Sequence, residues 1–475
     1  MAFDMNMNFY HDIEIYKDRI AVVTDAGRAY TYAEMLESAD QIAQSIPTRS
    51  LVFLVCNNCY ESVAAYIGFL RKQIVPVLIN PKIDDAMLSF LMESYQPQYV
   101  FCPRDWHGEG EHVEEFDTYH LLRTGSATAP AMNPELAVLI TTSGSTGSPK
   151  LVMQSYKNIN ANAQSIVEYL GITKEDRAIT TMPMSYTFGL SIIQSHLMAG
   201  ARIVVTEKTL MDKGFWALLK EQEVTTFGGV PYIYEMLKRL RFARMELPSL
   251  RYVTQAGGKL SKELVLEFAQ ICRDKGMKFI VMYGQTEATA RMAYMPWEFV
   301  FEKTASMGIA IPGGKFSLID ADGALIQEDE TVGELVYEGD NVTLGYALSA
   351  ADLANPDQRN GVLQTGDMAK RDKDGFYYIV GRKKRFLKIY GNRVNLDETE
   401  GILNKEGFRC VCGGRDDQLK IYLEASCSRD PEEAIAFISS KIGLNRSAFA
   451  AVVIDEIPRN DSGKVLYSKL EELYG

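Results

Sequence analysis

The chain has 475 residues, of which 47% are hydrophobic and 24% charged, as in a globular protein long enough for two or more domains. No run approaches the roughly 18 apolar residues of a membrane span, and the first nine residues do not resemble a signal peptide. We therefore expect a cytoplasmic protein without an integral membrane span.

The formal net charge of −12 is unevenly distributed along the chain. Residues 382–475 carry 16 Lys and Arg against 15 Asp and Glu, so the acidic excess lies in residues 1–381. An acidic body argues against nucleic acid or an anionic membrane as the main partner. Six basic residues between Arg382 and Arg393 form a local site for an anionic group.

The cysteines and histidines do not indicate a metal centre. Seven cysteines, an odd number, do not suggest a disulfide framework, and the lone C-x-x-C at Cys56 and Cys59 is best explained as reduced, partly buried thiols. The histidines at 107, 112 and 120 lack the spacing of zinc ligands and lie in a Glu-rich stretch.

Strand and helix patterns alternate over the first part of the chain. Thr31 with Glu34 three residues later is the signature of a capping box, so we expect a helix over residues 31–46. Further strands are expected at 51–56, 75–79 and 99–102, and further helices at 61–70 and 86–93. This alternation is typical of parallel βαβ units. Residues 106–134 are expected to form a loop without regular structure.

A hydroxyl-rich stretch, Thr142-Ser143-Gly144-Ser145-Thr146-Gly147-Ser148-Pro149-Lys150, follows an apolar run at 136–139. We expect a buried strand before it and a helix after it. Glycines let backbone N–H groups approach a phosphate, hydroxyls add donors and Lys150 adds charge. The stretch lacks the spacing of a Walker A loop, and taken alone it is equally compatible with an ordinary surface loop.

The alternation continues to residue 282 and then changes. Strands are expected at 178–182, 201–205, 224–227, 251–254 and 279–282, with helices at 191–198, 215–221, 231–240 and 263–272. These elements are enough for two αβ-type sheets. From about residue 305, short strands and glycine turns predict a small antiparallel β unit, and the last 90 or so residues predict a compact α+β module.

The hydroxyl-rich stretch and four later motifs, in this order, resemble those of the ANL superfamily of adenylate-forming enzymes. That group includes acyl- and aryl-CoA synthetases, adenylation domains and luciferases. The later motifs are Tyr283-Gly284-Gln285-Thr286-Glu287, Gly333-Glu334-Leu335 with Gly345-Tyr346, Thr365-Gly366-Asp367, and Pro458-Arg459-Asn460-Asp461-Ser462-Gly463-Lys464. Five motifs in the family's order make a chance match improbable.

The resemblance implies an α/β fold with two domains. Residues 1–381 would form a large N-terminal adenylation domain of two αβ-layered sheets plus a small β-barrel-like unit. Residues 382–475 would form a small, mobile α+β C-terminal domain. By the family pattern, Lys384 is the hinge between them.

The implied reaction is attack of a carboxylate on the α-phosphorus of ATP, giving acyl-AMP and pyrophosphate, and then transfer of the acyl group to the thiol of CoA. Glu287 would hold Mg²⁺, Asp367 would bind the ribose, and Lys464 would bridge the carboxylate and the α-phosphate. Lys388 resembles a position used in the thiol half-reaction. The catalytic set is Lys464, Glu287, Thr142 and Lys388. The implied nucleotide contacts are Thr142, Ser143, Gly144, Ser145, Thr146, Gly147, Lys150, Gly257, Gly258, Tyr283, Gly284, Thr286, Asp367, Arg382 and Arg393.

The acid pocket is implied to be lined by Tyr186, Phe188, Gly189, Gly228, Val230 and Gln285. Members that activate amino acids carry Phe-Asp-x-Ser, whose carboxylate pairs with the substrate ammonium. Here that stretch is Phe188-Gly189-Leu190-Ser191. Because a buried ammonium without a partner costs several kcal/mol, we expect a small-molecule carboxylic acid without an α-ammonium.

Two other functions use the same motifs. A stand-alone adenylation enzyme would load the acyl group onto the phosphopantetheine of an acyl carrier protein, and the basic residues from Arg382 to Arg393 would suit CoA or an acidic carrier equally well. A third hypothesis is an inactive relative that binds an adenylate without reacting. The presence of Lys464, Glu287 and Asp367 argues against it. The sequence carries no signal of oligomeric state.

Overall fold

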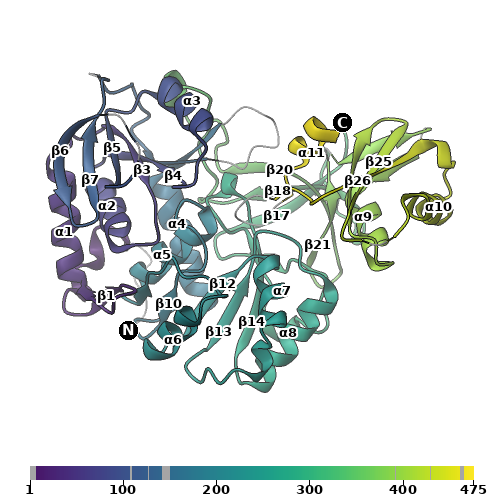
Figure 1. Cartoon of the computed structure of the whole chain (residues 1–475), viewed down its shortest axis with the longest axis horizontal. Helices are drawn as coiled ribbons and strands as arrows, with labels where there is room; N and C mark the ends of the chain where they lie inside the picture. The colour runs from purple at the N-terminus through teal and green to yellow at the C-terminus, as the bar shows by residue number, and fades with distance from the viewer. Residues whose placement is uncertain are drawn as a thin grey trace. The chain divides into compact units, whose positions relative to one another are not determined.

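The structure is a computed structural model of the chain (Figure 1). It describes residues 7–106, 108, 110–126, 128–141, 150–383, 385–390, 392–427, 429–459 and 465–474, without the side chains of residues 386, 392, 393 and 468. The described residues form two compact units. One holds residues up to 141 together with 150–315 and 338–363, and the other holds 316–337 and 364–474.

The first unit contains a nine-stranded sheet. Its strands from β14 to β1 pair in parallel, and the other three are antiparallel. The order across the sheet is β16 (Ile309–Ala310), β15 (Ala293–Tyr294), β14 (Lys278–Tyr283), β13 (Tyr252–Gln255), β12 (Thr226–Gly229), β10 (Arg177–Ile179), β11 (Arg202–Val204), β1 (Ile20–Val23) and β2 (Ala29–Thr31).

An eight-stranded sheet lies in the same unit. Four central strands are parallel and buried along their length, as expected of strands covered on both faces. The order is β19 (Gly345–Ala347), β9 (Leu151–Ser155), β8 (Leu136–Thr141), β4 (Val75–Ile79), β3 (Leu51–Val55), β5 (Tyr99–Pro103), β7 (Tyr119–Arg123) and β6 (Glu111–Phe116).

Helices cover these sheets (Figure 1). Four of them share one apolar core with strands of both sheets, namely α1 (Tyr32–Gln44), α2 (Tyr60–Arg71), α4 (Tyr156–Leu170) and α5 (Thr187–Met198). The helix α3 (Asp85–Tyr95) packs on the other apolar face of the eight-stranded sheet. The remaining helices of this unit are α6 (Lys213–Glu221), α7 (Pro231–Arg239) and α8 (Lys262–Asp274). The predicted α/β class and its two αβ-layered sheets are confirmed.

The expectation of an irregular loop over residues 106–134 is wrong. This segment contains a β-hairpin of β6 and β7, and β7 pairs antiparallel with β5. The edge strand β6 has the sequence Glu-His-Val-Glu-Glu-Phe and lies largely exposed. Because an edge strand need not bury alternate side chains, its charged sequence hid the strand from a pattern based on apolar residues.

The strand and the helix predicted on either side of the hydroxyl-rich stretch are present as β8 and α4, but the strand between Lys150 and that helix was not predicted. A second strand, β9, follows Lys150 and pairs antiparallel with β8, with Thr141 opposite Leu151. Helix α4 begins only at Tyr156, where Ser155 is its N-cap. The hydroxyl-rich stretch therefore joins two antiparallel strands, and a helix N-terminus does not follow it directly.

The second unit begins with an antiparallel β unit, as predicted. Its sheet has the order β17 (Lys315–Ile319), β18 (Gly333–Glu338), β20 (Val362–Arg371) and β21 (Tyr377–Arg382). The remaining elements are β22 (Phe386–Ile389), β23 (Asn392–Asn395), α9 (Leu396–Lys405), β24 (Cys410–Arg415), β25 (Gln418–Glu424), α10 (Pro431–Ile442), β26 (Phe449–Ile454) and α11 (Tyr467–Tyr474). This unit includes residues on both sides of position 382, where the sequence predicted the start of the C-terminal domain. That domain boundary stays a prediction.

The sequence predicted neither a membrane span nor a disulfide framework. In the part that the structure describes, no helix is both long and apolar enough to cross a bilayer. The seven cysteines are free thiols. Burial raises the pKa of the Cys56 and Cys59 thiols, so this C-x-x-C pair lacks the depressed pKa of a redox-active motif.

The capping box of α1 gives a test of how local sequence fixes this fold. Thr31 N–H donates to Glu34 Oε2 at 2.7 Å, and Glu34 N–H donates to Thr31 Oγ1 at 3.2 Å. Thr31→Ala removes an N-cap acceptor, so we expect the free energy of unfolding to fall by about 1 kcal/mol. Urea unfolding measures it. Thr331→Ala, at an exposed turn, is the control, and an equal loss in both variants would contradict the capping argument.

Candidate functional site

Glu287 lies in the turn just after β14, and its main chain is held by several donors. Its carbonyl oxygen accepts hydrogen bonds from the Thr343 N–H at 3.0 Å, from Thr343 Oγ1 at 2.9 Å and from Arg359 Nη1 at 3.2 Å. These contacts tie the Tyr283–Glu287 motif to residues on both sides of β19. The position of the carboxylate is therefore fixed by tertiary contacts.

Tyr346 connects two residues that the sequence assigned to ATP and Mg²⁺. Its hydroxyl donates to Glu287 Oε1 at 2.6 Å, and the Lys150 ammonium lies 3.6 Å from the centre of its ring. The Arg359 guanidinium lies over the same ring at 4.6 Å. Burial, together with Glu287, raises the pKa of Tyr346, so its hydroxyl remains a donor at neutral pH.

Sequence reasoning assigned Tyr346 only to a structural motif and did not single out Arg359. The signal for Tyr346 was its place beside Gly345, but nothing in the pattern showed that its hydroxyl reaches Glu287. Since β19 pairs with β9, the start of β9 and Lys150 lie beside Tyr346. Sheet pairing brings these residues together across almost 200 positions of sequence.

The Glu287 site fits a magnesium ion that arrives with a nucleotide. The carboxylate is partly exposed, and among the described residues no group of three or more His, Cys, Asp or Glu side chains could enclose a metal by itself. Mg²⁺ in phosphate sites is commonly held by one or two carboxylates, with water and phosphate oxygens completing its shell. A single carboxylate beside a lysine matches that donor set.

Several predicted residues lie outside the described part of the chain. These are Thr142, Ser143, Gly144, Ser145, Thr146, Gly147, Lys384 and Lys464. The backbone of Arg393 lies in β23, and its side chain is not described. Their assignments stay predictions.

The turn around Gly284 admits no side chain. A Cβ built on Gly284 would lie 1.7 Å from the carbonyl oxygen of Ala290, which is backbone and cannot move aside. Thr286 Oγ1 lies 3.5 Å from Thr187 Oγ1 at the start of α5, and Gln285 Nε2 donates to the Tyr283 hydroxyl at 3.3 Å. The motif is thus packed against α5, where the predicted acid pocket begins.

Three of the predicted pocket residues belong to one apolar cluster. Phe188 and Val230 are buried there, Tyr186 packs against them, and the rings of Tyr186 and Phe188 meet edge to face at 6.4 Å. A Cβ on Gly228 would lie 2.9 Å from the Phe188 ring. Gly257 has φ +81° and lies under the Tyr186 hydroxyl, so a left-handed backbone and a close approach both require glycine.

The neighbouring glycines are also tightly packed. A Cβ on Gly258 would lie 3.1 Å from the Pro231 ring. On Gly189 it would lie 2.3 Å from the Pro183 carbonyl oxygen and 2.7 Å from that of Met182. Position 189 therefore has no room for an aspartate, the residue expected there in amino-acid-activating members of the superfamily.

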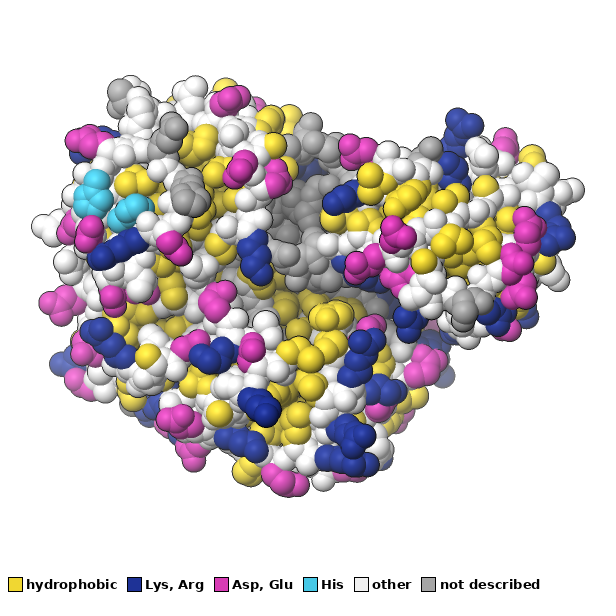
Figure 2. Space-filling model, in the orientation of Figure 1, with side chains coloured by type: hydrophobic (Ala, Val, Ile, Leu, Met, Phe, Trp, Pro, Cys, Tyr) yellow, Lys and Arg dark blue, Asp and Glu magenta, His cyan; other side chains and the backbone are white. Residues whose placement is uncertain are grey.

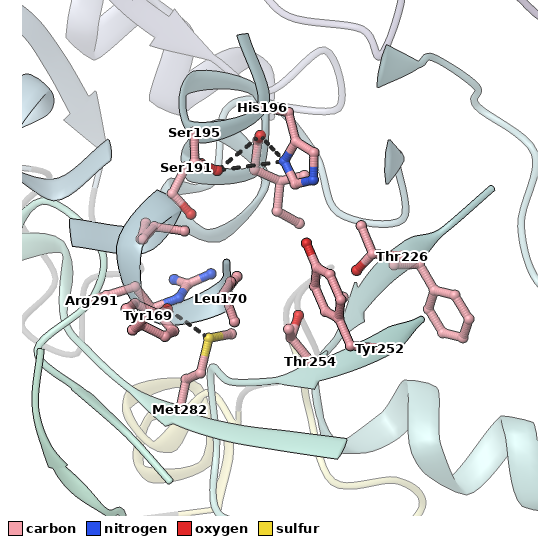
Figure 3. Close-up of a pocket in the computed structure, with 14 residues that line it drawn as sticks. Tyr169, Leu170, Ser191, Ser195, His196, Thr226, Tyr252, Thr254, Met282 and Arg291 are labelled. Carbon is pink, nitrogen blue, oxygen red and sulfur yellow. Dashed lines mark hydrogen bonds between the residues drawn. The ribbon is translucent and has the colours of Figure 1, made fainter. Parts of the chain in front are cut away.

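A small cavity of about 20 Å³ adjoins this cluster (Figure 3). Gly228 is the one predicted pocket residue among its described lining residues. Sequence reasoning missed the others that carry polar groups, among them His196, Tyr252 and Arg291. One sequence feature could have pointed to this cavity. Arg291 is the only charged residue between Glu287 and Glu298.

The second unit contains Asp367. This carboxylate is 4% exposed, lies opposite Arg382 across β20 and β21, and forms an ion pair with Arg382 Nε at 3.3 Å. Its own N–H donates to Thr365 Oγ1 at 3.1 Å. The predicted motif Thr365-Gly366-Asp367 thus forms a local hydrogen-bonded turn with an oriented carboxylate.

The basic stretch after residue 381 is partly neutralised within this unit. Lys383 pairs with Glu334 at 2.6 Å, and Arg385 pairs with Asp397 at 2.5 Å and with Glu400. Lys388 lies exposed on β22, in register with Arg393 on β23. Lys388 is therefore better placed than Lys383 or Arg385 to meet an anionic ligand. Figure 2 shows side chains of both charges interspersed on the face in view.

Comparison with known proteins gives consistent matches over nearly the whole chain. The family model of AMP-binding enzymes matches residues 9–347. A 2-succinylbenzoate–CoA ligase of Bacillus licheniformis is 26% identical over 96% of this chain and 97% of its own length. One of Bacillus cereus is 30% identical over 89% and 88%.

The fold also matches a solved structure. This is o-succinylbenzoate CoA synthetase from Bacillus subtilis in complex with its acyl-adenylate intermediate, with a TM-score of 0.79 and 23% identity over 98% of both chains.

The Tyr346 hydroxyl can be tested separately from its ring. Tyr346→Phe removes the hydrogen bond to Glu287 and keeps the ring under Lys150. Loss of a group that orients a metal-binding carboxylate typically costs about 10- to 100-fold, so we expect the KM for Mg-ATP to rise within that range. Steady-state kinetics at varied Mg²⁺ measure it.

Tyr95→Phe is the matched control, because the Tyr95 hydroxyl donates to the Ala347 carbonyl at 2.8 Å in the same strand region without reaching Glu287. Equal KM values for wild type and Tyr346→Phe would contradict the role of this hydroxyl.

Proposed function

The chain belongs to the family of AMP-binding enzymes, and on that basis we propose that it activates a small carboxylic acid without an α-ammonium through ATP and transfers the acyl group to CoA. It is an AMP-forming acid–thiol ligase, as the sequence predicted. The observation that carries the proposal furthest is the Lys150–Tyr346–Glu287 arrangement. In it, one tyrosine contacts both the cation that we assign to phosphate and the carboxylate that we assign to Mg²⁺.

The residues of the first unit would bind the phosphates and the acid. Lys150, with the preceding hydroxyl-rich stretch, would bind the β- and γ-phosphates, and Glu287 would hold Mg²⁺. The ion would offset charge on the phosphate oxygens. Tyr186, Phe188 and Val230 would exclude water around the acid, which strengthens every electrostatic interaction there.

The residues of the second unit would bind the nucleoside and complete the reaction centre. Asp367 would accept from both ribose hydroxyls, with Arg382 holding its carboxylate. Lys464 would bring the substrate carboxylate and the α-phosphate together. Because such a reaction needs little covalent help from the protein, positioning and charge stabilisation would supply most of the rate.

Transfer to a thiol would need a second arrangement of the chain. Lys464 must leave the reaction centre before a thiol can reach the acyl carbon, so we propose that residues 382–475 rotate about Lys384. The exposed Lys388 would then face the incoming thiol substrate.

A carrier protein is the alternative to CoA as the acceptor of the acyl group. A phosphopantetheinyl carrier protein would present the same thiol as CoA, and acidic residues on it could meet Lys388 and Arg393. The full-length match to CoA ligases favours CoA. We place this reaction in the cytoplasm, where ATP and CoA are available.

The first test is pyrophosphate release with Mg-ATP across a panel of carboxylic acids, each with and without CoA. One acid should give multiple turnovers only when CoA is present. Amino acids should be inactive because position 189 lacks the aspartate, and turnover with one would contradict that argument. Release that stops near one equivalent per enzyme despite CoA would instead favour a carrier protein as acceptor.

The role of Lys464 has its own test. Lys464→Ala should slow adenylate formation on the order of 10²–10³-fold, as for loss of other transition-state donors, and should spare thioester formation from added acyl-AMP. Rapid-quench kinetics of the two half-reactions separate these effects. Lys469→Ala, an exposed lysine of α11, is the control, and equal slowing of both half-reactions in Lys464→Ala would count against the assignment.

A further inference from the structure

Arg291 is a buried cation beside the predicted acid pocket. It is 3% exposed and lies four residues after Glu287. Burial lowers the pKa of its guanidinium, with Tyr169 and Tyr186 acting in the opposite direction. Because the pKa of an arginine guanidinium in water lies far above neutral pH, the side chain stays charged.

The contacts of this cation do not include an anion. Its guanidinium lies 4.2 Å from the centre of the Phe188 ring, near the Tyr169 and Tyr186 hydroxyls. Its Nε has no hydrogen-bond partner, and no carboxylate of the described residues forms an ion pair with it. A stacked aromatic ring offsets only part of the cost of burying a charge. The structure therefore leaves a positive charge incompletely balanced.

The backbone of Arg291 is fixed in place. Its carbonyl accepts from Asn162 Nδ2 at 3.0 Å and from Asn341 Nδ2 at 2.8 Å, and its N–H donates to Asn162 Oδ1 at 3.4 Å. Two buried amide side chains thus hold this one residue from different elements. A site whose residues are held before the ligand arrives loses less entropy on binding.

The cavity beside Arg291 contains two more buried polar atoms without a partner among the described residues. These are the Tyr252 hydroxyl and His196 Nε2, each on a side chain 2% exposed. Figure 3 shows both rings and the Arg291 guanidinium around the same space. Buried polar groups are almost always paired in native proteins. Three such atoms lining one cavity indicate a polar ligand.

The histidine does not add a second charge. Its Nδ1 lies 2.8 Å from the Ile192 carbonyl oxygen, so Nδ1 carries the proton and donates. Burial lowers the pKa of His196, which keeps the ring neutral. Arg291 is therefore the one charged side chain among the described residues that line the cavity.

We propose that Arg291 binds a second carboxylate of the acid, so that the substrates of this enzyme are dicarboxylic acids. One carboxylate would react at the α-phosphate, and the other would pair with Arg291 at the far end of the pocket. A guanidinium matches a carboxylate with two parallel hydrogen bonds, and one cation balances one carboxylate, whereas a phosphate group would bring nearly two negative charges. The Tyr252 hydroxyl supplies a further donor.

Position supports the same assignment. Gly228 and Phe188 were predicted to line the acid pocket, Gly228 also lines the cavity, and Phe188 lies directly under the guanidinium. The cavity is thus a continuation of that pocket. Its volume of about 20 Å³ has room for one terminal carboxylate and not for a whole acid, so the rest of the acid would occupy the predicted pocket. This inference rests on the proposed function, since it names the substrate class of the same site.

The test compares matched acids in wild type and two variants. Dicarboxylic acids of three to six carbons, malonate to adipate, are paired with monocarboxylic acids of the same length, and kcat/KM is measured by pyrophosphate release. Wild type should favour one of the dicarboxylic acids on the order of 10²-fold or more over its partner. Arg291→Met should lose that preference mainly through KM, and Arg291→Lys should retain part of it.

The control is Arg202→Met, on β11 outside the cavity, which should keep the wild-type preference. A second measurement does not need turnover, because the dicarboxylic acid should raise the melting temperature of wild type and not that of Arg291→Met. Circular dichroism of both variants shows whether each is folded.

The outcomes separate the two proposals. Activation of monocarboxylic acids as fast as of dicarboxylic acids, or an unchanged preference in folded Arg291→Met, would overturn the role of Arg291 and leave the ligase function standing. Absence of pyrophosphate release with every acid, together with Arg291-dependent stabilisation by a dicarboxylic acid, would support the binding site and refute the proposed function.

Discussion

The hydrogen bond from the Tyr346 hydroxyl to Glu287 joins the parts of the first unit on which phosphate chemistry depends. It connects the end of a strand in the nine-stranded sheet to an edge strand of the eight-stranded sheet. Lys150 lies over the same ring, so one aromatic side chain contacts both an ammonium and a carboxylate. This arrangement supports the proposed roles of Lys150 toward phosphate and of Glu287 toward Mg²⁺.

The predicted acid pocket follows a different physical rule, which is exclusion of side-chain volume. Glycines at 189, 228 and 257 sit where a Cβ would meet backbone carbonyls or the rings of Phe188 and Tyr186. Their absence of side chains lets the surrounding backbone and aromatic rings pack closely. Arg291 adds a buried charge beside Phe188, where the low dielectric strengthens its interaction with an anion.

The family, the α/β architecture and the AMP-forming ligase reaction, all predicted from motifs, are confirmed. Motifs succeed here because a turn such as Tyr283–Glu287 needs its residues in fixed local order. The irregular loop expected at 106–134 was wrong, and the strand between Lys150 and the predicted helix α4 was not foreseen. In both places a strand formed through pairing with distant residues, for which local periodicity carries little information.

The sequence by itself determined which residue types could perform the chemistry and where strands and helices alternate, because capping, apolar periodicity and glycine-rich turns are local properties. Thr31 and Glu34 are an example, since their capping box needs only four neighbouring residues. Only the tertiary structure decided which partners hold these groups. Tyr346 meets Glu287, and Arg291 enters the cavity beside Phe188, because sheet pairing and helix packing bring together residues that are far apart along the chain.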